Sequence, residues 1–310
     1  MGFSRISTSF PTDLSLFFLH KNQERTTQLQ SMIATGQNIQ KPSDDAIGMN
    51  RLLRNKLDLS RDMQFQRNLN TAISELNVNE NVLNGVTDVI QRARELAVQA
   101  SSQTNGPNDL LAIQEEVDAL IQTTFQLANT TYLGRYTFAG FRTDTPAFTQ
   151  SGLDVTYAGT ANTVPFQRQI EVADGITIPV NFNGQDVFGS VAVVAGNPVG
   201  SGLFNTLRKM SLDLQNANYT GLNQDVALLA TDLENVTSIR AEVGARVNQA
   251  EALLQLNENR QITFTEQIAD VQDVDLPTVI SQLAQHDQQY QTSLASLSRI
   301  LSTSLVNFLR

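Results

Sequence analysis

Adjacent acidic side chains are the first residues in this sequence that could act in acid–base chemistry. Asp44 is followed by Asp45, and Glu115 is followed by Glu116. An acid and a base must face one substrate, but neighbours on a helix point about 100° apart, so neither pair meets this requirement. Helix capping and a solvated helix face explain these residues more simply. We therefore predict no active site built on paired carboxylates.

Two histidines and an acidic run are the other candidates for chemistry. His20 and His286 lie in the terminal segments, so a pH-dependent contact between the two ends is one interpretation. Two polar helix positions are the other, which we favour because neither histidine has a triad-like serine and carboxylate around it. Asp270, Asp273 and Asp275 could attract calcium, but the run lacks the glycine and the final glutamate of an EF-hand loop. We interpret this run as a break between helices.

Larger catalytic motifs are absent from the sequence as well. It contains no Walker phosphate loop, no GxGxxG, no HExxH and no nucleophile elbow. It also contains no cysteine, which excludes disulfides, a thiol nucleophile and a thiolate metal site. We therefore predict that the chain is not an enzyme, with no catalytic, cofactor-binding or metal-binding residues and no cofactor.

Charge and hydropathy limit the partners of the chain. A formal net charge of -10 and a pI near 4.7 disfavour nucleic acid and anionic lipid, because both select clustered lysine and arginine. No apolar run approaches the roughly 20 residues that span a bilayer. The run from Leu14 to Leu19 follows Asp13 and is shorter than the core of a signal peptide. We expect no nucleic-acid partner, no membrane partner and no cleaved secretory signal.

Helical periodicity fills the first part of the chain. Gly36 fits a helix C-cap, and Ser43 with Asp44 and Asp45 supplies an N-cap and a negative first turn for a long helix. Apolar residues then recur at alternating spacings of three and four, with the polar Asn79 in one slot. They are Leu69, Ala72, Leu76, Leu83, Val86, Ile90, Ala93 and Ala97. A turn before Pro107 predicts a second helix, antiparallel to the first.

The middle of the chain has the spacing of a small β insert. Between Asn129 and Phe148 the apolar residues change from a helical rhythm to alternation. The firmest strand prediction is a hairpin over residues 170–182, because its apolar residues alternate on both sides of Asp174-Gly175, a dipeptide favoured in tight hairpins. The insert extends to about residue 197.

Helical periodicity returns near Leu203 and continues to the last residues. Gly221 marks a break before the longest helix, in whose seam Arg240 is a polar residue of the kind that sets register. Residues 270–277 separate this helix from a final one. Two helical parts thus flank a strand-rich insert where the chain reverses direction, which predicts a mainly α fold with a small β insert. We expect an elongated, discontinuous helical bundle with coiled-coil arms.

Four segments of the sequence resemble a known family. They are MGFSRISTSF at the start, ATGQNIQKPSDDAIG before the long helix, NTTYLGRYTFAGFRTDTPAF at the change of spacing, and GQDVF at residues 184–188. Together they resemble the flagellin superfamily, and GRYTFAGFRTDTPAF more closely resembles the proteins at the junction of the flagellar hook and filament. Ala34 stands where the family usually has serine, and Gly2-Phe3 precedes Ser4-Arg5, but neither departure touches the apolar seam.

The resemblance implies a layered architecture with three domains. Residues 1–42 with 272–310 would form a terminal helical coiled-coil domain, residues 43–145 with 203–271 a helical bundle, and residues 146–202 an outer β-rich domain. It implies a structural role joining hook to filament, outside the cell, after export without a cleaved signal. A flagellin filament subunit is the alternative within the family, and a soluble coiled-coil signalling scaffold is the alternative outside it.

The resemblance also implies the partners of the chain. They are other copies of itself, a neighbouring hook-associated protein on the hook side, flagellin on the filament side, and a cytoplasmic export chaperone on the C-terminal segment. Apolar stripes reach both ends of the chain, where ends normally fray unless something covers them. We predict that these stripes are the assembly interface, through Ile6, Phe10, Leu14, Phe17, Leu283, Tyr290, Leu294, Leu297, Leu301 and Phe308.

Overall fold

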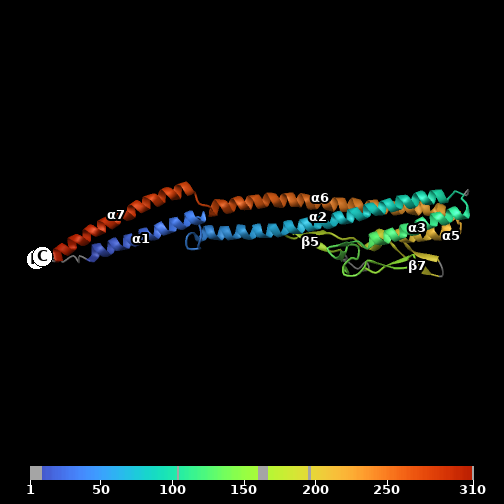
Figure 1. The fold of residues 1–310 in the computed structure, drawn as a ribbon, viewed down its shortest axis with the longest axis horizontal. Helices are drawn as coiled ribbons and strands as arrows, with labels where there is room; N and C mark the ends of the chain where they lie inside the picture. Colours follow the sequence, from blue (N-terminus) through green and yellow to red (C-terminus); the bar gives the residue numbers. More distant parts are fainter. Residues whose placement is uncertain (1–8, 103–104, 160–166, 195–196, 309–310) are drawn as a thin grey trace. The chain divides into compact units, whose positions relative to one another are not determined.

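The computed structural model describes residues 9–102, 105–159, 167–194 and 197–308, and the side chains of these except residues 9–12, 192–194, 197–198 and 300–308. The elements, labelled in Figure 1, are α1 Ser9–Thr35, α2 Ala46–Ala100, α3 Pro107–Ala128, β1 Thr131–Tyr132, β2 Arg135–Tyr136, β3 Phe148–Ser151, β4 Asp154–Tyr157, β5 Gln169–Ala173, β6 Ile176–Pro179, α4 Gly184–Phe188, β7 Ser190–Val194, β8 Asn197–Ser201, α5 Gly202–Gln215, α6 Tyr219–Gln272 and α7 Leu276–Phe308. The fold is mainly α with small β hairpins, which confirms the predicted class.

Two compact units divide the chain. Met1–Arg61 with Arg260–Arg310 form what we call the terminal unit, and Asp62–Asn259 form the central unit. The long helices α2 and α6 contribute residues to both units. None of the helices in the described ranges combines the length and the hydropathy of a bilayer-spanning segment.

The terminal unit pairs the two ends of the sequence. Helix α1 lies along α7 (Figure 1), with Leu29, Met32 and Val279 buried between them. Where the chain leaves α1 and α6, two linkers form an antiparallel bridge: Asn38 N donates to the carbonyl of Gln272 at 2.7 Å, and Val274 N donates to that of Gly36 at 3.0 Å. Backbone hydrogen bonds thus join segments that are more than two hundred residues apart.

The linker before α2 shows how the helix begins. Gly36 has φ +70 directly after α1, as predicted for a C-cap. The predicted start at Ser43 is wrong, because α2 begins at Ala46 and the Asp45 carboxylate accepts from the backbone N–H groups of Ile47 and Gly48 at 2.9 and 3.0 Å. Asp45 is therefore the N-cap.

Asp44 has a different task from its neighbour. Its carboxylate accepts from the backbone N–H groups of Lys41 and Gln40 at 2.9 and 3.1 Å, which closes the turn before the helix. These two hydrogen bonds, with Lys41 first, hold the pKa of Asp44 below its ordinary value because they favour the charged form. The two adjacent aspartates are structural, as the sequence indicated.

The central unit has its core where the heptad pattern places it. All eight predicted apolar residues between Leu69 and Ala97 of α2 are fully buried, together with residues of α3, α5 and α6. Helices α3 and α5 lie side by side (Figure 1). The predicted α2–α3 turn is confirmed, since α3 begins at Pro107 after an extended Gly106.

Polar residues in this seam make specific contacts across the unit. Arg240 of α6 donates to the Glu80 carboxylate at 2.7 and 3.0 Å and to the Thr87 hydroxyl at 3.2 Å, which ties α6 to α2. Asn79 of α2 is fully buried, and its amide donates to the carbonyl of Val180 at 2.9 Å. Arg246 donates to the carbonyl of Pro179 at 3.0 Å. The end of the β5–β6 hairpin is thus held by both long helices.

The β elements form separate two-stranded antiparallel hairpins. The predicted hairpin over residues 170–182 is confirmed as β5–β6, with Gly175 at φ +70 in its turn and an irregularity between Glu171 and Ala173. Phe148 of β3 belongs to an aromatic cluster of fully buried rings 5.1 to 6.0 Å apart, whose other members are Phe138, Phe188 and Phe204. This cluster joins β3 to α4 and α5.

A partly buried ion pair connects α5 with the first turns of α6. Lys209 Nζ lies 3.0 Å from Asp225 Oδ1 and 3.9 Å from Asp213 Oδ2. Asp225 is fully buried, and its burial raises the pKa of the carboxyl to about 6 although Lys209 favours the charged form. The break before α6 lies at residues 216–218, where Ala217 has φ +50, so the predicted break at Gly221 is wrong by one turn.

Candidate assembly surface

The α1 half of the predicted surface is exposed on the described chain. Leu14 is 45% exposed and Phe17 is 61% exposed, and they stand beside Leu16 at 41% and Phe18 at 53%. The Phe17 and Phe18 rings contact each other at 5.8 Å between centroids. Four large apolar side chains within five residues leave more surface in water than scattered exposed leucines would. Of the remaining predicted α1 residues, Ile6 lies outside the described residues and the Phe10 side chain lies outside the described side chains.

The α7 half divides into covered and uncovered residues. Leu283 is half-buried and packs against the cluster of Leu29, so it helps to join α7 to α1. Tyr290 and Leu297 are half-buried, and Leu294 is 42% exposed. Leu301 and Phe308 belong to α7, but their side chains lie outside the described ones.

Other apolar residues of the terminal unit are exposed as well. Ile47 and Leu57 on α2 are 84% and 69% exposed, Ile262 on α6 is 59% exposed, and Ile280 on α7 is 54% exposed. Ile280 belongs to the apolar stripe of the last helix, whereas Ile47, Leu57 and Ile262 were not predicted. They extend the apolar surface of this unit beyond the predicted stripes.

A groove follows the pair of α1 and α7. It has a volume of about 730 Å³ and is lined by Ser15, Phe18, Asn22, Gln285, Gln288, Gln289, Thr292, Ser293 and Ser296. Apart from the Phe18 ring, these are amides and hydroxyls, which can donate and accept hydrogen bonds but carry no charge. The groove suits contact with another polar helix and provides no acid, base or metal ligand.

A second hollow surrounds His20 beside the linker. It holds about 490 Å³, and His20, Glu24, Lys41 and Asp44 are its charged or titratable lining residues. The Asp44 carboxylate is already occupied by backbone N–H groups. His286, the other histidine, does not line this hollow. No hydrogen bond between a nucleophile and a base is seen among the described lining residues, so the geometry gives no support for an active site in this hollow.

The predicted break between α6 and α7 is present but shorter than expected: it is confined to residues 273–275, so Asp270 belongs to α6 and Pro277 to α7. Helix α6 ends at Gln272 and α7 begins at Leu276, and the Asp275 carboxylate accepts from the Thr278 hydroxyl at 2.5 Å. In the ranges that the structure describes, no group of three histidine or acidic side chains lies close enough to hold a metal ion.

Two family models match this chain at its two helical ends. The bacterial flagellin N-terminal helical region matches residues 6–143, and the bacterial flagellin C-terminal helical region matches residues 226–309. Flagellar hook-associated protein 3 of Escherichia coli is 27% identical, over 97% of this chain and 98% of its own length. Flagellin of Listeria monocytogenes is 25% identical over 92% of each chain.

A solved structure shares the fold. The flagellar junction protein FlgL from Legionella pneumophila has a TM-score of 0.58 and 18% sequence identity, and the match covers 72% of this chain and all of that one.

Proposed function

Because the chain belongs to the flagellin superfamily and is a structural component of the bacterial flagellum, we propose that its place is the junction between hook and filament. The observation that carries the proposal is that hook-associated protein 3 of Escherichia coli matches 97% of this chain and 98% of its own length at 27% identity, more than the 92% of each chain that Listeria monocytogenes flagellin matches at 25% identity. A match confined to the helical ends would not separate a junction protein from flagellin, since both model regions are flagellin regions.

The proposed mechanism is assembly without catalysis. Leu14, Phe17 and Leu294 present apolar surface that one folded chain leaves in water, and burying it against neighbours lowers the free energy. We include the other predicted residues of the two terminal helices in this interface. The partners are further copies of the chain, a hook-associated protein on the hook side and flagellin on the filament side.

The same proposal covers the domains and the route out of the cell. We propose that residues 1–42 with 272–310 form the assembly domain, residues 43–145 with 203–271 the bundle, and residues 146–202 the outer β domain. The linker bridge between Gln37 and Asp273 supports a boundary near the ends of α1 and α6. Export without a cleaved signal, and a chaperone that covers the C-terminal segment beforehand, complete the proposal.

The test is the location of the protein in the cell that makes it. A labelled antibody against the chain should bind in one band at the cell-proximal end of the filament. Label along the whole filament would make the chain a flagellin subunit, and label confined to the cytoplasm would favour a coiled-coil scaffold. Either of these two results overturns the proposal.

A further inference from the structure

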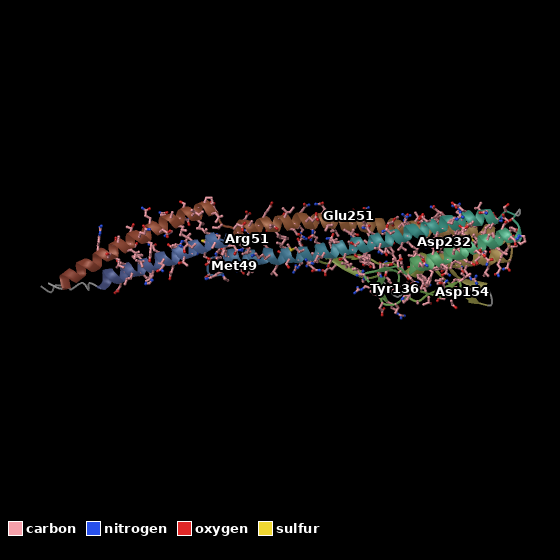
Figure 2. All side chains as sticks on the ribbon, in the orientation of Figure 1. Met49, Arg51, Tyr136, Asp154, Asp232 and Glu251 are labelled. Carbon is pink, nitrogen blue, oxygen red and sulfur yellow. The ribbon has the colours of Figure 1, made fainter. Side chains whose placement is uncertain are left out.

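The first four turns of α2 form a basic and apolar surface. Residues 46–61 contain four basic side chains and one acidic side chain, in a chain whose formal net charge is -10. Ile47, Arg51 and Arg54 follow one another at spacings of four and three, so they share one face of the helix. All three are exposed, Ile47 by 84%, and Leu57 beside them is 69% exposed. We call this surface the basic face; Figure 2 labels Arg51 on it.

The end of α6 and the linker after it have the opposite charge. Residues 260–280 contain four acidic side chains and one basic side chain. Ile262, Glu266 and Asp270 stand at spacings of four on one face of α6, and Asp273 follows in the linker. All four are exposed, with Ile262 at 59%. We call this surface the acidic face.

The charges that define the two faces form no ion pairs in the part of the chain that the structure describes. Among the described residues, no ion pair includes Arg51, Arg54, Glu266 or Asp270. Exposed charges are well solvated in water, so they need no partner by themselves. The basic face, however, also exposes Ile47 and Leu57, and the acidic face exposes Ile262, and burial of these aliphatic side chains would be favourable.

We propose that the basic face of one copy docks on the acidic face of the next copy. The two faces match in charge and each contributes apolar residues, which are the features of an electrostatically aligned interface. Like faces repel, so two basic faces or two acidic faces do not pair. The proposal rests on the proposed function, because it describes how copies of an axial protein contact one another.

A second copy of the chain is the partner that these two faces fit, because one chain carries both of them. Contact between two different surfaces of one chain is heterologous, and repetition of such a contact gives a ring or an open helix. The terminal unit carries both surfaces. A copy that docks through one face keeps its other face free, and the next copy can bind there. This contact is separate from the apolar stripes of α1 and α7, and it depends on salt because its charges are exposed.

The absence of cysteine makes a direct test possible. One variant carries Asn50→Cys beside the basic face, and a second, with a size tag, carries Thr265→Cys beside the acidic face. Both substituted side chains are exposed, and neither substitution removes a charge. Both variants are produced in cells without the native chain, and intact flagella are treated with a short thiol cross-linker. We expect the mixed dimer of tagged and untagged chains at least tenfold above either homodimer.

Two controls fix the interpretation. The pair of Asn50→Cys with Thr123→Cys, an exposed position on α3, should give no mixed dimer. Adding Arg51→Glu and Arg54→Glu to the Asn50→Cys chain should abolish the cross-link, and adding Glu266→Arg and Asp270→Arg to its partner should restore it. A mixed dimer no more abundant than the homodimers, or one that survives the charge reversal, overturns the proposal. An antibody band at the hook in the same cells would leave the proposed function standing.

Discussion

Replacing the exposed apolar residues of α1 by aspartate should prevent assembly and leave the fold intact. Leu14 and Phe17 are 45% and 61% exposed, and complete burial of such a side chain contributes about 1.5 to 3 kcal/mol. The exposed fractions leave about 1.5 to 3 kcal/mol for the two residues together in each intersubunit contact. This corresponds to roughly one to two orders of magnitude in the association constant. Two carboxylates that lose water at the interface add to the loss.

The folded chain should tolerate the same change. About half of these two side chains is covered within one chain, so the cost there is about 1.5 to 3 kcal/mol of lost burial for the pair. Helix propensity adds less than about 1 kcal/mol per residue. Circular dichroism of the purified Leu14→Asp/Phe17→Asp variant should therefore show the helix content of the native protein. Electron microscopy of cells that carry only this variant should show hooks without attached filaments.

A matched variant separates the apolar contact from the added charge. Gln23→Asp with Gln30→Asp places the same two charges at exposed polar positions of α1 and should leave filaments attached. Normal, firmly attached filaments in the Leu14→Asp/Phe17→Asp cells would refute the proposed assembly surface. Lost helix content in that variant would refute the conclusion that these residues are free of the fold.

Three further predictions concern the central unit. The folded pKa of Asp225 is raised to about 6, so its contribution to stability is fully present below the ordinary pKa of 3.8 and is lost as the pH rises through 6. Asp225→Asn should therefore weaken the fall of the melting temperature between pH 4 and 7. Gly189→Ala should lower the free energy of unfolding, measured by urea titration, by about 3 kcal/mol or more, since an added Cβ would lie 1.7 Å from the Ser201 carbonyl oxygen. The control Gly175→Ala is also at positive φ but in open space, and it should cost about 1 to 2 kcal/mol. Phe188→Ala should cost about 3 to 5 kcal/mol by urea titration, because three other rings pack against it; a loss under 1 kcal/mol would contradict its place in the cluster.

The seam of the bundle was predictable because its signal is geometric. Spacings of three and four put Leu69 through Ala97 on one side of α2, and any partner helix must bury that side. The β5–β6 hairpin was predictable for a similar reason, since alternation and Asp174-Gly175 both follow from the hairpin geometry. In these places one local pattern determines the structure.

Helix ends were less predictable because several residues have the same capping ability. Ser43, Asp44 and Asp45 can each accept from free N–H groups, and only the surrounding turn decides that Asp44 closes the linker and Asp45 caps α2. At the other break, Ala217 adopts the left-handed conformation although Gly221 is nearby, because the Asn218 backbone N–H donates to the Asp213 carbonyl at 2.8 Å. Residue preferences for helix or turn do not predict backbone hydrogen bonds of this kind.

The candidate surface was only partly predictable, since a heptad position does not tell an internal partner from an external one. Leu283 and Leu294 belong to the same stripe of α7, yet Leu283 packs on the α1 cluster and Leu294 is exposed. The charged faces on α2 and α6 were not predictable from periodicity, because their few apolar residues stand between charges. Only their exposure reveals them.

The polar residues of the central seam explain how a long apolar interface adopts one alignment. A shift of α6 by one heptad moves it by about 10 Å and exchanges one aliphatic side chain for another, so the apolar seam alone discriminates weakly. The same shift would separate Arg240 from Glu80 and Thr87 and leave these partly buried groups without partners, at a cost of about 1 to 3 kcal/mol each. It would also remove Arg246 of α6 from the carbonyl of Pro179 in β6, and this hydrogen bond helps to hold the β insert on α6. Apolar burial therefore supplies most of the stability of this bundle, whereas a few polar contacts specify its register and the attachment of the insert.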